Sequence, residues 1–279
     1  MTDRYAVIGN PISHSKSPLI HKLFAQQTGQ DISYAAIEAP LDGFSATIER
    51  LRREGYKGGN VTLPFKFEAF RLATQPSDRA TAPRAANTLK FIGNQVIGDN
   101  TDGVGLVTDI KNNRGFDFSG KRVLLVGAGG AAWGVLLPLL HQAPARLVLS
   151  NRTIAKAEEA AQILHSRFGE HISGSTEFIA KSFSDLNGEK FDLIINATSA
   201  GLTDSEVPLP SGIFAPGALA YDMMYGRETP FMAFARANGA AVVADGLGML
   251  VEQAAEAFYI WRGVRPETAP VIAKLRTPQ

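Results

Sequence analysis

The sequence predicts an α/β fold whose core is a parallel β-sheet, and three observations predict it. Short apolar runs typical of strands alternate with helical patterns from residue 5 to residue 262, and such alternation favours parallel strands with right-handed crossovers. The run at 122–126 is almost wholly apolar, which is typical of a parallel strand covered on both faces. The chain has 279 residues, 45% hydrophobic and 20% charged, enough for about two ordinary globular domains.

The composition excludes several classes of protein. Basic residues number 28 and acidic residues 27, so no general attraction to nucleic acid or to an anionic membrane is expected. The absence of cysteine excludes disulfides, thiolate nucleophiles and iron–sulfur clusters. The five histidines lack metal-binding spacing, so we expect no metal. We expect a cytoplasmic protein, because no signal-peptide pattern and no apolar run of ~18 residues is present.

In the first part of the chain, turn and capping signals separate three strand–helix pairs. The expected strands are 5–8, 32–38 and one that ends at 60–62, followed by a hairpin at 88–99 that turns at Gly93-Asn94. The expected helices begin at Ser17, after Asp42 as an N-cap, and with Pro64 in the first turn.

A second strand–helix series follows. Its expected strands are 122–126, 146–150, 191–198, 218–224 and 241–244, and its expected helices end at His141 or span 153–168 and 246–262. Pro266 is expected to open a last short helix. The segment 115–120 is expected to be a linker, and 164–184 a variable surface region.

A glycine-rich turn follows the first strand of this second series. Residues 127–132 fit the pattern G-x-G-x-x-A between a predicted strand and a predicted helix. The first glycine permits the tight turn, the second lets the backbone approach a pyrophosphate, and the alanine lets the helix pack closely. The candidate cofactor-binding residues at this helix N-terminus are Gly127, Ala128, Gly129, Gly130 and Ala131. A turn used only for close packing is the alternative.

The end of the next strand indicates which dinucleotide is bound. NAD-binding proteins place an acidic residue there for the ribose hydroxyls. This chain has Asn151, Arg152 and Thr153 instead, with Lys156 one turn into the helix. An arginine fork can bind a 2′-phosphate that a carboxylate would repel, so we expect NADP rather than NAD. Alternatively, Thr153 only caps the helix and the two cations are solvated, which is compatible with the first interpretation.

Three polar stretches in the first part are candidates for a small-molecule site. Ser15 and Ser17 lie at a helix start suited to a small carboxylate, although Ser17 could be only a cap. Lys66 stands in the first turn of a helix, where acidic residues are usual, so it could transfer protons or be a solvated surface lysine. Asp102 opens another helix and could be only its N-cap.

Nine motifs together resemble the shikimate dehydrogenase family. They are SKSP (15–18), NVTLPFK (60–66), AANTL (85–89), DNTDGVG (99–105), GAGGAA (127–132), NRT (151–153), NATSAG (196–201), DMMY (222–225) and ADGLGMLVEQAAEAF (244–258). The likeness spans nearly the whole chain in the family's order. The resemblance implies NADPH-dependent reduction of 3-dehydroshikimate to shikimate in the shikimate pathway, which leads to chorismate and the aromatic amino acids.

The resemblance also implies roles for individual residues. Lys66 and Asp102 match the catalytic pair. The positions that match substrate-binding residues are Ser15, Ser17, Thr62 and Tyr225 around the carboxylate, and Asn60, Asn87 and Gln253 at the ring hydroxyls. Further contacts with the cofactor are implied for Thr198, Met223 and Gly246. Trp133, just after the glycine-rich turn, departs from the small polar or basic residue of several relatives.

Two domains follow from the resemblance. Residues 1–103 with 245–279 are expected to form the substrate-binding and catalytic domain, to which the C-terminal helices return. Residues 104–244 are expected to form a Rossmann-type, doubly wound parallel-sheet domain for NADP. The expected partner is the small-molecule substrate, with no nucleic acid or membrane, in a monomer or homodimer. Two alternatives remain open: a quinate/shikimate dehydrogenase of relaxed substrate or cofactor preference, and a non-catalytic NADP-binding regulator.

Overall fold

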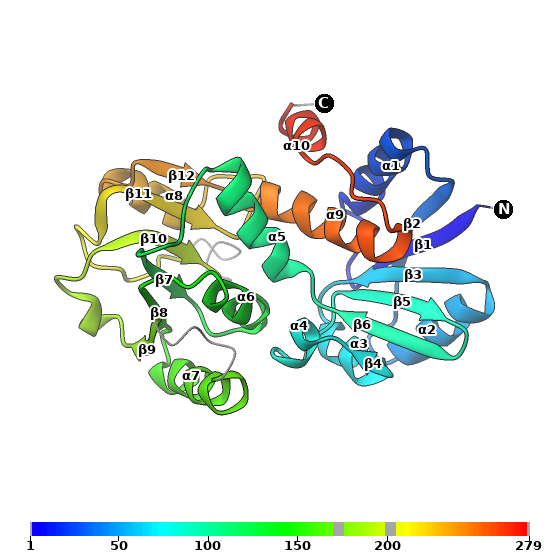
Figure 1. The fold of residues 1–279 in the computed structure, drawn as a ribbon, viewed down its shortest axis with the longest axis horizontal. Coiled ribbons are helices and arrows are strands. Elements are labelled where there is room, and N and C mark those ends of the chain that lie inside the picture. Colours follow the sequence, from blue (N-terminus) through cyan, green and yellow to red (C-terminus); the bar gives the residue numbers. More distant parts are fainter. Residues whose placement is uncertain (1, 170–175, 199–204, 278–279) are drawn as a thin grey trace. The chain divides into compact units, whose positions relative to one another are not determined.

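The computed structural model describes residues 2–169, 176–198 and 205–277, which belong to two compact units (Figure 1). The first unit comprises residues 1–105 and 250–279, and the second comprises residues 106–249. The first unit is therefore discontinuous in sequence. The divisions fall inside two helices, α5 (Asp102–Thr108) and α9 (Leu247–Arg262).

The first unit contains a mixed sheet in which six strands are described, in the order β2-β1-β3-β5-β6-β4. Their bounds are β1 (Asp3–Gly9), β2 (Ile32–Glu38), β3 (Tyr56–Val61), β4 (Gln75–Pro76), β5 (Thr88–Ile92) and β6 (Gln95–Asp99). β1 is parallel to β2 and to β3, as expected from the helices between them. β5 is antiparallel to both β3 and β6, and with β6 it forms the predicted hairpin.

Helices cover both faces of this sheet, as Figure 1 shows. On one face lie α2 (Phe44–Arg53), α3 (Lys66–Leu72) and the single turn α4 (Asp78–Thr81), and on the other lie α1 (Ser17–Thr28), α9 and α10 (Ala269–Arg276). Alternate residues of β1 point to the two faces: Ile8 is buried in the cluster with Phe44, whereas Tyr5 stacks on Trp261 of α9. A further cluster joins α1 to α9 through Phe24 and Phe258.

The second unit contains a parallel sheet in which six strands are described, in the order β12-β11-β10-β7-β8-β9. Their bounds are β7 (Arg122–Val126), β8 (Arg146–Ser150), β9 (Glu177–Lys181), β10 (Phe191–Asn196), β11 (Phe214–Asp222) and β12 (Val242–Ala244). Its main helices are α6 (Gly130–Leu140), α7 (Ile154–Phe168) and α8 (Pro230–Ala237). Numbered from β7, the strand order is the 3-2-1-4-5-6 of doubly wound dinucleotide-binding folds. Ligands bind such sheets at the carboxyl edge where the order reverses, here between β7 and β10.

Three helix starts differ from the sequence prediction. Gly43 is the N-cap of α2, so the prediction that Asp42 caps it is wrong. α3 begins at Lys66, which leaves Pro64 in the preceding turn, and α10 begins three residues after Pro266. Proline suits both the turn before a helix and its first turn, so its position locates a helix start only to within a few residues.

The segment 115–120 is not a linker between domains. It lies within the second unit, where Phe118 is 2% exposed and packs edge-to-face on Phe116. Its glycines satisfy a local requirement, because Gly115 and Gly120 both have positive φ angles. The glycines of this segment therefore mark turns of the chain and not a boundary between domains.

The interval 164–184 is more than a variable surface region. It contains the end of α7 and the edge strand β9, in which Phe178 is buried; residues 170–175 lie outside the described residues. β9 has charged residues at both ends, Glu177 and Lys181, which leaves a run too short for a clear strand pattern. α8 was also missing from the prediction, although Thr229 caps it and Pro230 follows at its first position.

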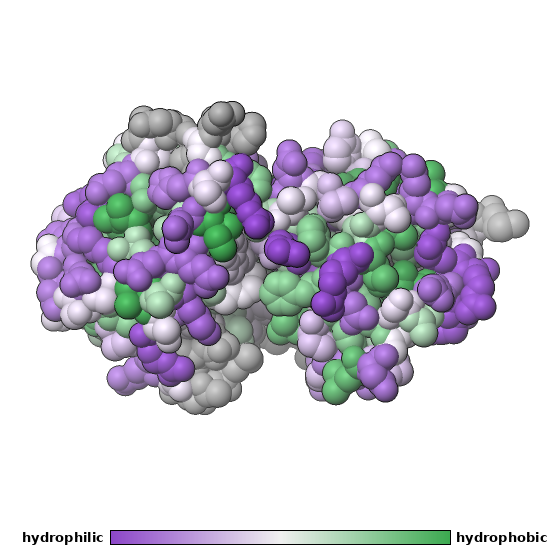
Figure 2. All heavy atoms as spheres, turned by 90° about the horizontal axis from the view of Figure 1, so that it is seen from below, coloured by the Kyte–Doolittle hydropathy of each residue, from purple (hydrophilic) through white to green (hydrophobic). Residues whose placement is uncertain are grey.

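On the face shown in Figure 2, hydrophobic side chains form separate patches among hydrophilic ones. Leu41 and Leu63 are among the large hydrophobic side chains that are exposed. Isolated apolar side chains of this kind are normal at a protein surface. None of the helices in the described ranges combines the length and the hydropathy that crossing a bilayer requires.

Candidate active site

Strand register places three polar side chains in one row across the first sheet. Asn60 of β3 pairs with Thr88 of β5, and Thr88 pairs with Asp99 of β6. All three residues are buried, and Asn60 Nδ2 donates a hydrogen bond to Thr88 Oγ1 at 3.1 Å. Glycine is required beside this row, because a Cβ at Gly58 would lie 2.3 Å from the Leu89 carbonyl oxygen. The row brings the chain after β3, before β5 and after β6 to the same edge of the sheet.

These segments contain the predicted catalytic pair. Lys66 begins α3 and Asp102 begins α5. Lys66 Nζ lies 2.5 Å from Asp102 Oδ2, so a charge-assisted hydrogen bond joins residues 36 positions apart in the chain. The two side chains are 26% and 13% exposed. Both are therefore partly shielded and still accessible to a small molecule.

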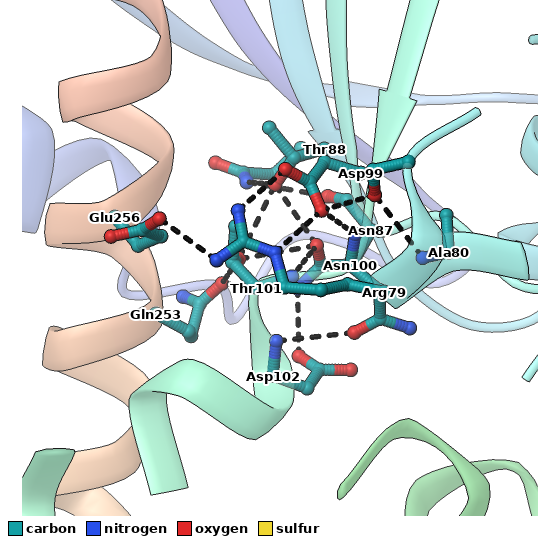
Figure 3. A network of polar contacts seen from close by, with 12 residues as sticks. Arg79, Ala80, Asn87, Thr88, Asp99, Asn100, Thr101, Asp102, Gln253 and Glu256 are labelled. Atoms are coloured by element: carbon teal, nitrogen blue, oxygen red, sulfur yellow. Dashed lines mark hydrogen bonds and ion pairs between the residues drawn. The ribbon is translucent and has the colours of Figure 1, made fainter. Parts of the chain in front are cut away.

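Asn87 lies between Asp102 of this pair and Gln253, a predicted substrate-binding residue (Figure 3). Its Nδ2 donates to Asp102 Oδ1 at 2.7 Å and lies 3.4 Å from Gln253 Oε1 on α9. Its Oδ1 accepts a hydrogen bond from the Thr101 N–H at 2.8 Å. The Asp102 N–H donates to Asn100 Oδ1 at 3.1 Å, a local bond from backbone to side chain at the start of α5. The carboxylate of Asp102 is engaged by Lys66 and Asn87, which contradicts the alternative of a simple N-cap.

Ser15, Ser17 and Thr62 lie in the loops that follow β1 and β3. Ser15 Oγ accepts a hydrogen bond from the Ser17 N–H at 3.3 Å. Ser17 is the first residue of α1, and Lys16 occupies the N-cap position, so Ser17 is not the cap. Thr62 packs over Gly9, where a Cβ would lie 2.5 Å from Thr62 Cγ2. The two loops therefore approach each other at the carboxyl ends of adjacent parallel strands.

The amide of Asn60 is held by a buried aromatic group. Tyr34 donates its hydroxyl hydrogen to Asn60 Oδ1 at 2.7 Å, and burial raises the pKa of this phenol, which keeps it a donor. The Tyr34 ring stacks on His21 with 4.1 Å between centroids. His21 is fully buried, and burial lowers the pKa of its imidazole to about 3, so the ring is neutral at physiological pH.

The glycine-rich turn joins β7 to α6, as the sequence predicts. Gly127 has a φ of +110°, and a Cβ there would lie 3.1 Å from the backbone of Ala197. Gly129 is the N-cap of α6, and a Cβ there would meet no heavy atom of the described chain within 4 Å. Gly130 and Ala131 form the exposed first turn of α6. The open side of Gly129 and the helix N-terminus fit the pyrophosphate of a dinucleotide.

The predicted phosphate-binding residues lie between β8 and the first turn of α7. Asn151 Oδ1 accepts a hydrogen bond from the Ala128 N–H at 3.3 Å, so this segment adjoins the glycine-rich turn. Arg152, Thr153 and Lys156 are exposed. Thr153 occupies the N-cap position of α7, without a side-chain capping bond among the described residues. Two exposed cations beside an anion-binding turn fit the additional phosphate of NADP.

The other predicted cofactor residues meet at the carboxyl ends of β10, β11 and β12. Thr198 donates its hydroxyl hydrogen to Asn196 Oδ1 at 2.7 Å, and the Met223 N–H donates to the Asn196 carbonyl oxygen at 3.0 Å. The Gly246 N–H donates to the Met224 carbonyl oxygen at 2.9 Å. A Cβ at Gly246 would lie 2.2 Å from the Met223 carbonyl oxygen, so glycine is required for this close approach.

Tyr225 follows these residues in the second unit, whereas the other predicted substrate-binding residues belong to the first unit. Its side chain is half-buried. Burial raises the pKa of the phenol, so it remains a hydrogen-bond donor at neutral pH. Tyr225 is thus chemically suited to bind a carboxylate, as the resemblance implies.

Sequence reasoning missed Asp222, which is fully buried at the end of β11. Its carboxylate accepts hydrogen bonds from Thr229 Oγ1 at 2.5 Å, the Met224 N–H at 2.9 Å and Asn196 Nδ2 at 3.2 Å. Burial raises the pKa of this carboxyl. Asp222 fixes the loop that carries Met223 and Tyr225. Its position at the end of a buried strand and in the motif DMMY, at the edge where ligands bind, was the available signal.

Tyr34 and Thr101 were also missed. Both are bonded to predicted site residues. Tyr34 has no pattern that distinguishes it from an ordinary strand residue, whereas Thr101 lies in the motif DNTDGVG but was given no role. Across the described part of the chain, no group of three histidine or acidic side chains could hold a metal ion. The first unit thus presents amides, hydroxyls and one lysine–carboxylate pair, which can bind a hydroxylated ring and move a proton.

Comparisons with known proteins agree along the chain. Residues 7–89 match the family described as shikimate dehydrogenase substrate binding domain, residues 109–203 match shikimate / quinate 5-dehydrogenase, and residues 246–276 match the shikimate 5′-dehydrogenase C-terminal domain. The chain is 60% identical over 274 residues to the shikimate dehydrogenase (NADP(+)) of Methylobacillus flagellatus, which covers 98% of this chain and 99% of the relative.

Solved structures give the same result. An Ael1 enzyme from Pseudomonas putida has a TM-score of 0.91 and 49% identity over 99% of both chains. The shikimate 5-dehydrogenase of Thermus thermophilus, solved in complex with NADP(H) and shikimate, has a TM-score of 0.85 and 31% identity over 99% of both chains. Identity at this level, over the full length of the relatives, establishes common descent as well as a common fold. The chain therefore belongs to the shikimate dehydrogenase family.

Proposed function

We propose that this protein catalyses the reversible, NADPH-dependent reduction of 3-dehydroshikimate to shikimate. The observation that carries the proposal is the Lys66–Asp102 pair, joined through Asn87 to Gln253, in a chain closely related to proteins named shikimate dehydrogenase (NADP(+)). The protein is accordingly an oxidoreductase that acts on a CH–OH group, in the shikimate pathway of aromatic amino acid biosynthesis.

The first unit is proposed to bind the substrate. Ser15 and Ser17 offer hydroxyl groups at the start of α1, where a helix N-terminus favours the substrate carboxylate. Asn87 and Gln253 offer amide groups next to the catalytic pair, which suits ring hydroxyls. The two side-chain N–H groups of Asn60 already donate to the Asn87 carbonyl oxygen and to Thr88 Oγ1. Asn60 would therefore accept a hydroxyl hydrogen from the substrate through its side-chain oxygen. Thr62 and Tyr225 are proposed to assist at the carboxylate.

Lys66 and Asp102 are proposed to manage the charge and the proton of the reaction. During reduction, negative charge develops on the substrate carbonyl oxygen, and the Lys66 ammonium group stabilises or protonates it. Asp102 orients Lys66 Nζ by accepting its hydrogen bond, and Asn87 holds the other carboxylate oxygen. At this separation the two groups can act as one coupled unit. In the oxidation direction the same pair removes the hydroxyl proton.

The second unit is proposed to bind NADP, which supplies or accepts the hydride when bound. The N-terminus of α6 and the open side of Gly129 receive the pyrophosphate. Arg152 and Lys156 neutralise the 2′-phosphate, and no carboxylate stands at residues 151–153 to repel it. Thr198, Met223 and Gly246 contact the remainder of the dinucleotide.

The decisive experiment is the absorbance of reduced nicotinamide after mixing the purified protein with shikimate and NADP. We expect rapid reduction of NADP, and a kcat/KM with NAD that is lower because NAD lacks the phosphate that Arg152 would bind. Quinate in place of shikimate tests the relaxed-specificity alternative, which comparable rates on the two substrates would favour. No shikimate-dependent reduction of either cofactor would leave the non-catalytic NADP-binding regulator as the better interpretation.

The proposal also covers the compartment in which the enzyme works and its oligomeric state. We place the enzyme in the cytoplasm, because a highly charged dinucleotide does not cross a lipid bilayer unaided and the enzyme must share its compartment. We propose a monomer or homodimer. Fractionation of cells and light scattering of the purified protein test the two statements separately.

A further inference from the structure

We infer that Arg79 is a positioning residue: its guanidinium ties the loop that carries Asp102 to the helix that carries Gln253. The inference rests on the proposed function of those two residues. It adds a charged residue, outside all of the motifs above, whose contribution is geometric and acts through its partners.

Arg79 lies in α4, a single turn between β4 and β5. Its Nε donates to Asp99 Oδ1 at 3.0 Å and its Nη2 donates to Asp99 Oδ2 at 2.6 Å, which makes a two-pronged pair. Its Nη1 donates to Glu256 Oε1 at 3.0 Å. Figure 3 shows the guanidinium between the two carboxylates. A planar group with donors in fixed directions can hold two carboxylates at a defined separation, which a lysine ammonium cannot do.

The Asp99 side of this bridge leads to the catalytic carboxylate. Asp99 ends β6 and is 8% exposed. Its Oδ1 also accepts the Asn100 N–H at 2.7 Å, and Asn100 Oδ1 accepts the Asp102 N–H at 3.1 Å. Hydrogen bonds therefore connect Arg79 to the backbone of Asp102 by way of Asp99 and Asn100, which belong to the same loop as Asp102. Without Arg79, Asp99 would be a buried carboxylate that has lost its cation and keeps only neutral donors, Ser77 Oγ and the Asn100 N–H, both at 2.7 Å and both on Oδ1.

The Glu256 side leads to the substrate-binding amide. Glu256 and Gln253 lie one turn apart on α9, and Gln253 Oε1 is 3.4 Å from both Asn87 Nδ2 and Thr101 Oγ1. Arg265 also pairs with Glu256, through its other oxygen. Loss of Arg79 would leave Glu256 paired with Arg265 but would remove its tie to β6. The Gln253 amide and the catalytic loop would then lose the charged one of their ties, while α9 would still be bonded to β5 through Trp261 and Lys90.

The main test compares Arg79→Gln with the control Arg262→Gln. Arg262 also belongs to the first unit and joins distant segments, through an ion pair with Asp3 and a hydrogen bond to Gln30, but it has no part in the Asp99–Asp102 loop. Both variants should lose some stability. For Arg79→Gln we expect kcat to fall about 10- to 100-fold and KM for shikimate to rise several-fold, with KM for NADP within about twofold of wild type. For Arg262→Gln we expect kcat and both KM values within about twofold of wild type.

Two further variants separate the arms of the bridge. Arg79→Lys keeps the charge and loses the fork, so it should restore folding and recover kcat only in part. Glu256→Ala keeps the pair between Arg79 and Asp99, so it should raise KM for shikimate while kcat stays within about threefold of wild type. These two variants decide the question if Arg79→Gln does not fold. Full recovery by Arg79→Lys, or an unchanged KM in Glu256→Ala, would overturn the inference.

Calorimetric binding of shikimate without cofactor supplies a readout that does not depend on turnover. Weaker binding by Arg79→Gln, with wild-type binding by Arg262→Gln, is the expected result. Wild-type protein that does not oxidise shikimate would reject the proposed function itself. Active wild-type protein together with a folded Arg79→Gln that has normal kcat, KM and shikimate binding would reject only the positioning role.

Discussion

Lys66 is the residue whose loss should damage the reaction most directly. Its ammonium group is the cation bonded to Asp102, at 2.5 Å. We expect Lys66→Ala to lower kcat by at least ~100-fold, the usual scale for a group that transfers a proton. Lys57→Ala, which removes an exposed lysine of β3, is the control and should leave kcat unchanged. Steady-state oxidation of shikimate measures both, and near-normal turnover of a folded Lys66→Ala would refute the assigned role.

Arg152 should determine the choice of cofactor and not the affinity for substrate. A charge-assisted hydrogen bond to the 2′-phosphate is worth ~1.5–3 kcal/mol, so Arg152→Ala should raise KM for NADP roughly tenfold or more. KM for NAD and the affinity for shikimate should change little, because neither ligand presents this phosphate. Arg167→Ala, at the other end of α7, is a matched control. Fluorescence titration with each cofactor checks the prediction, and an unchanged preference for NADP would contradict it.

For individual residues of the site, the sequence could predict some roles and not others. The types of residue and their places at strand ends or helix starts indicated Lys66 and the cofactor candidates in 127–131 and 151–156, and the resemblance added the remaining assignments. No pattern could show that Asp102 uses its carboxylate on Lys66 and Asn87 instead of capping its helix, because that depends on three segments meeting across the sheet. The role of Arg79 could not be predicted for the same reason, because both of its partners, Asp99 and Glu256, lie far from it in the chain.

At the scale of elements, glycine serves two different purposes in the turn between β7 and α6: one glycine is needed for the backbone conformation, and the other for access of the cofactor. Gly127 has a positive φ and backbone neighbours, so Gly127→Ala should lower the free energy of unfolding by ~1–3 kcal/mol. Gly129 has a φ of −86° and open space, so Gly129→Ala should fold normally and bind NADP more weakly. Urea unfolding and cofactor titration of both variants check this contrast. Equal stability losses in the two variants would be inconsistent with it.

Prediction of elements succeeded where one signal dominated. Strands β2, β7 and β8 lie where the apolar runs placed them, because each is an uninterrupted or alternating run between turn residues. Prediction failed where competing signals overlapped: prolines near α3 and α10 fitted two positions, and charges at both ends of β9 concealed an edge strand. The α/β class and the parallel sheet were still predictable, because they follow from the alternation of elements and not from their exact bounds, whereas the doubly wound order was implied by the resemblance.

At the scale of the whole molecule, His21 should contribute to the pH dependence of stability. Its pKa is about 3 in the folded protein and ~6.5 in the unfolded chain, so the unfolded chain binds the additional proton between these values. The stability that His21 contributes is complete above pH ~6.5 and is lost as the pH falls towards 3, by up to ~1.4 kcal/mol per pH unit.

The test compares chemical unfolding of three proteins between pH 7 and pH 4. His21→Phe keeps an aromatic ring beside Tyr34 and should show a shallower loss of stability on acidification than wild type. His141→Gln alters an exposed histidine and should retain the wild-type slope. Identical slopes in all three proteins would exclude His21 as a source of acid sensitivity.

The discontinuity of the first unit has a consequence for biosynthesis. The second unit is one continuous stretch, residues 106–249, so the ribosome synthesises all of it before the chain ends. In the first unit, by contrast, Ile20 and Phe24 pack against α9, which begins only at residue 247. At 5–20 residues per second, Ile20 and Phe24 must wait roughly 10–45 s for that helix, with their apolar side chains uncovered. Translation speed and chaperone supply should therefore govern the yield of the first unit, whereas the second unit, which is continuous in sequence, can fold during elongation.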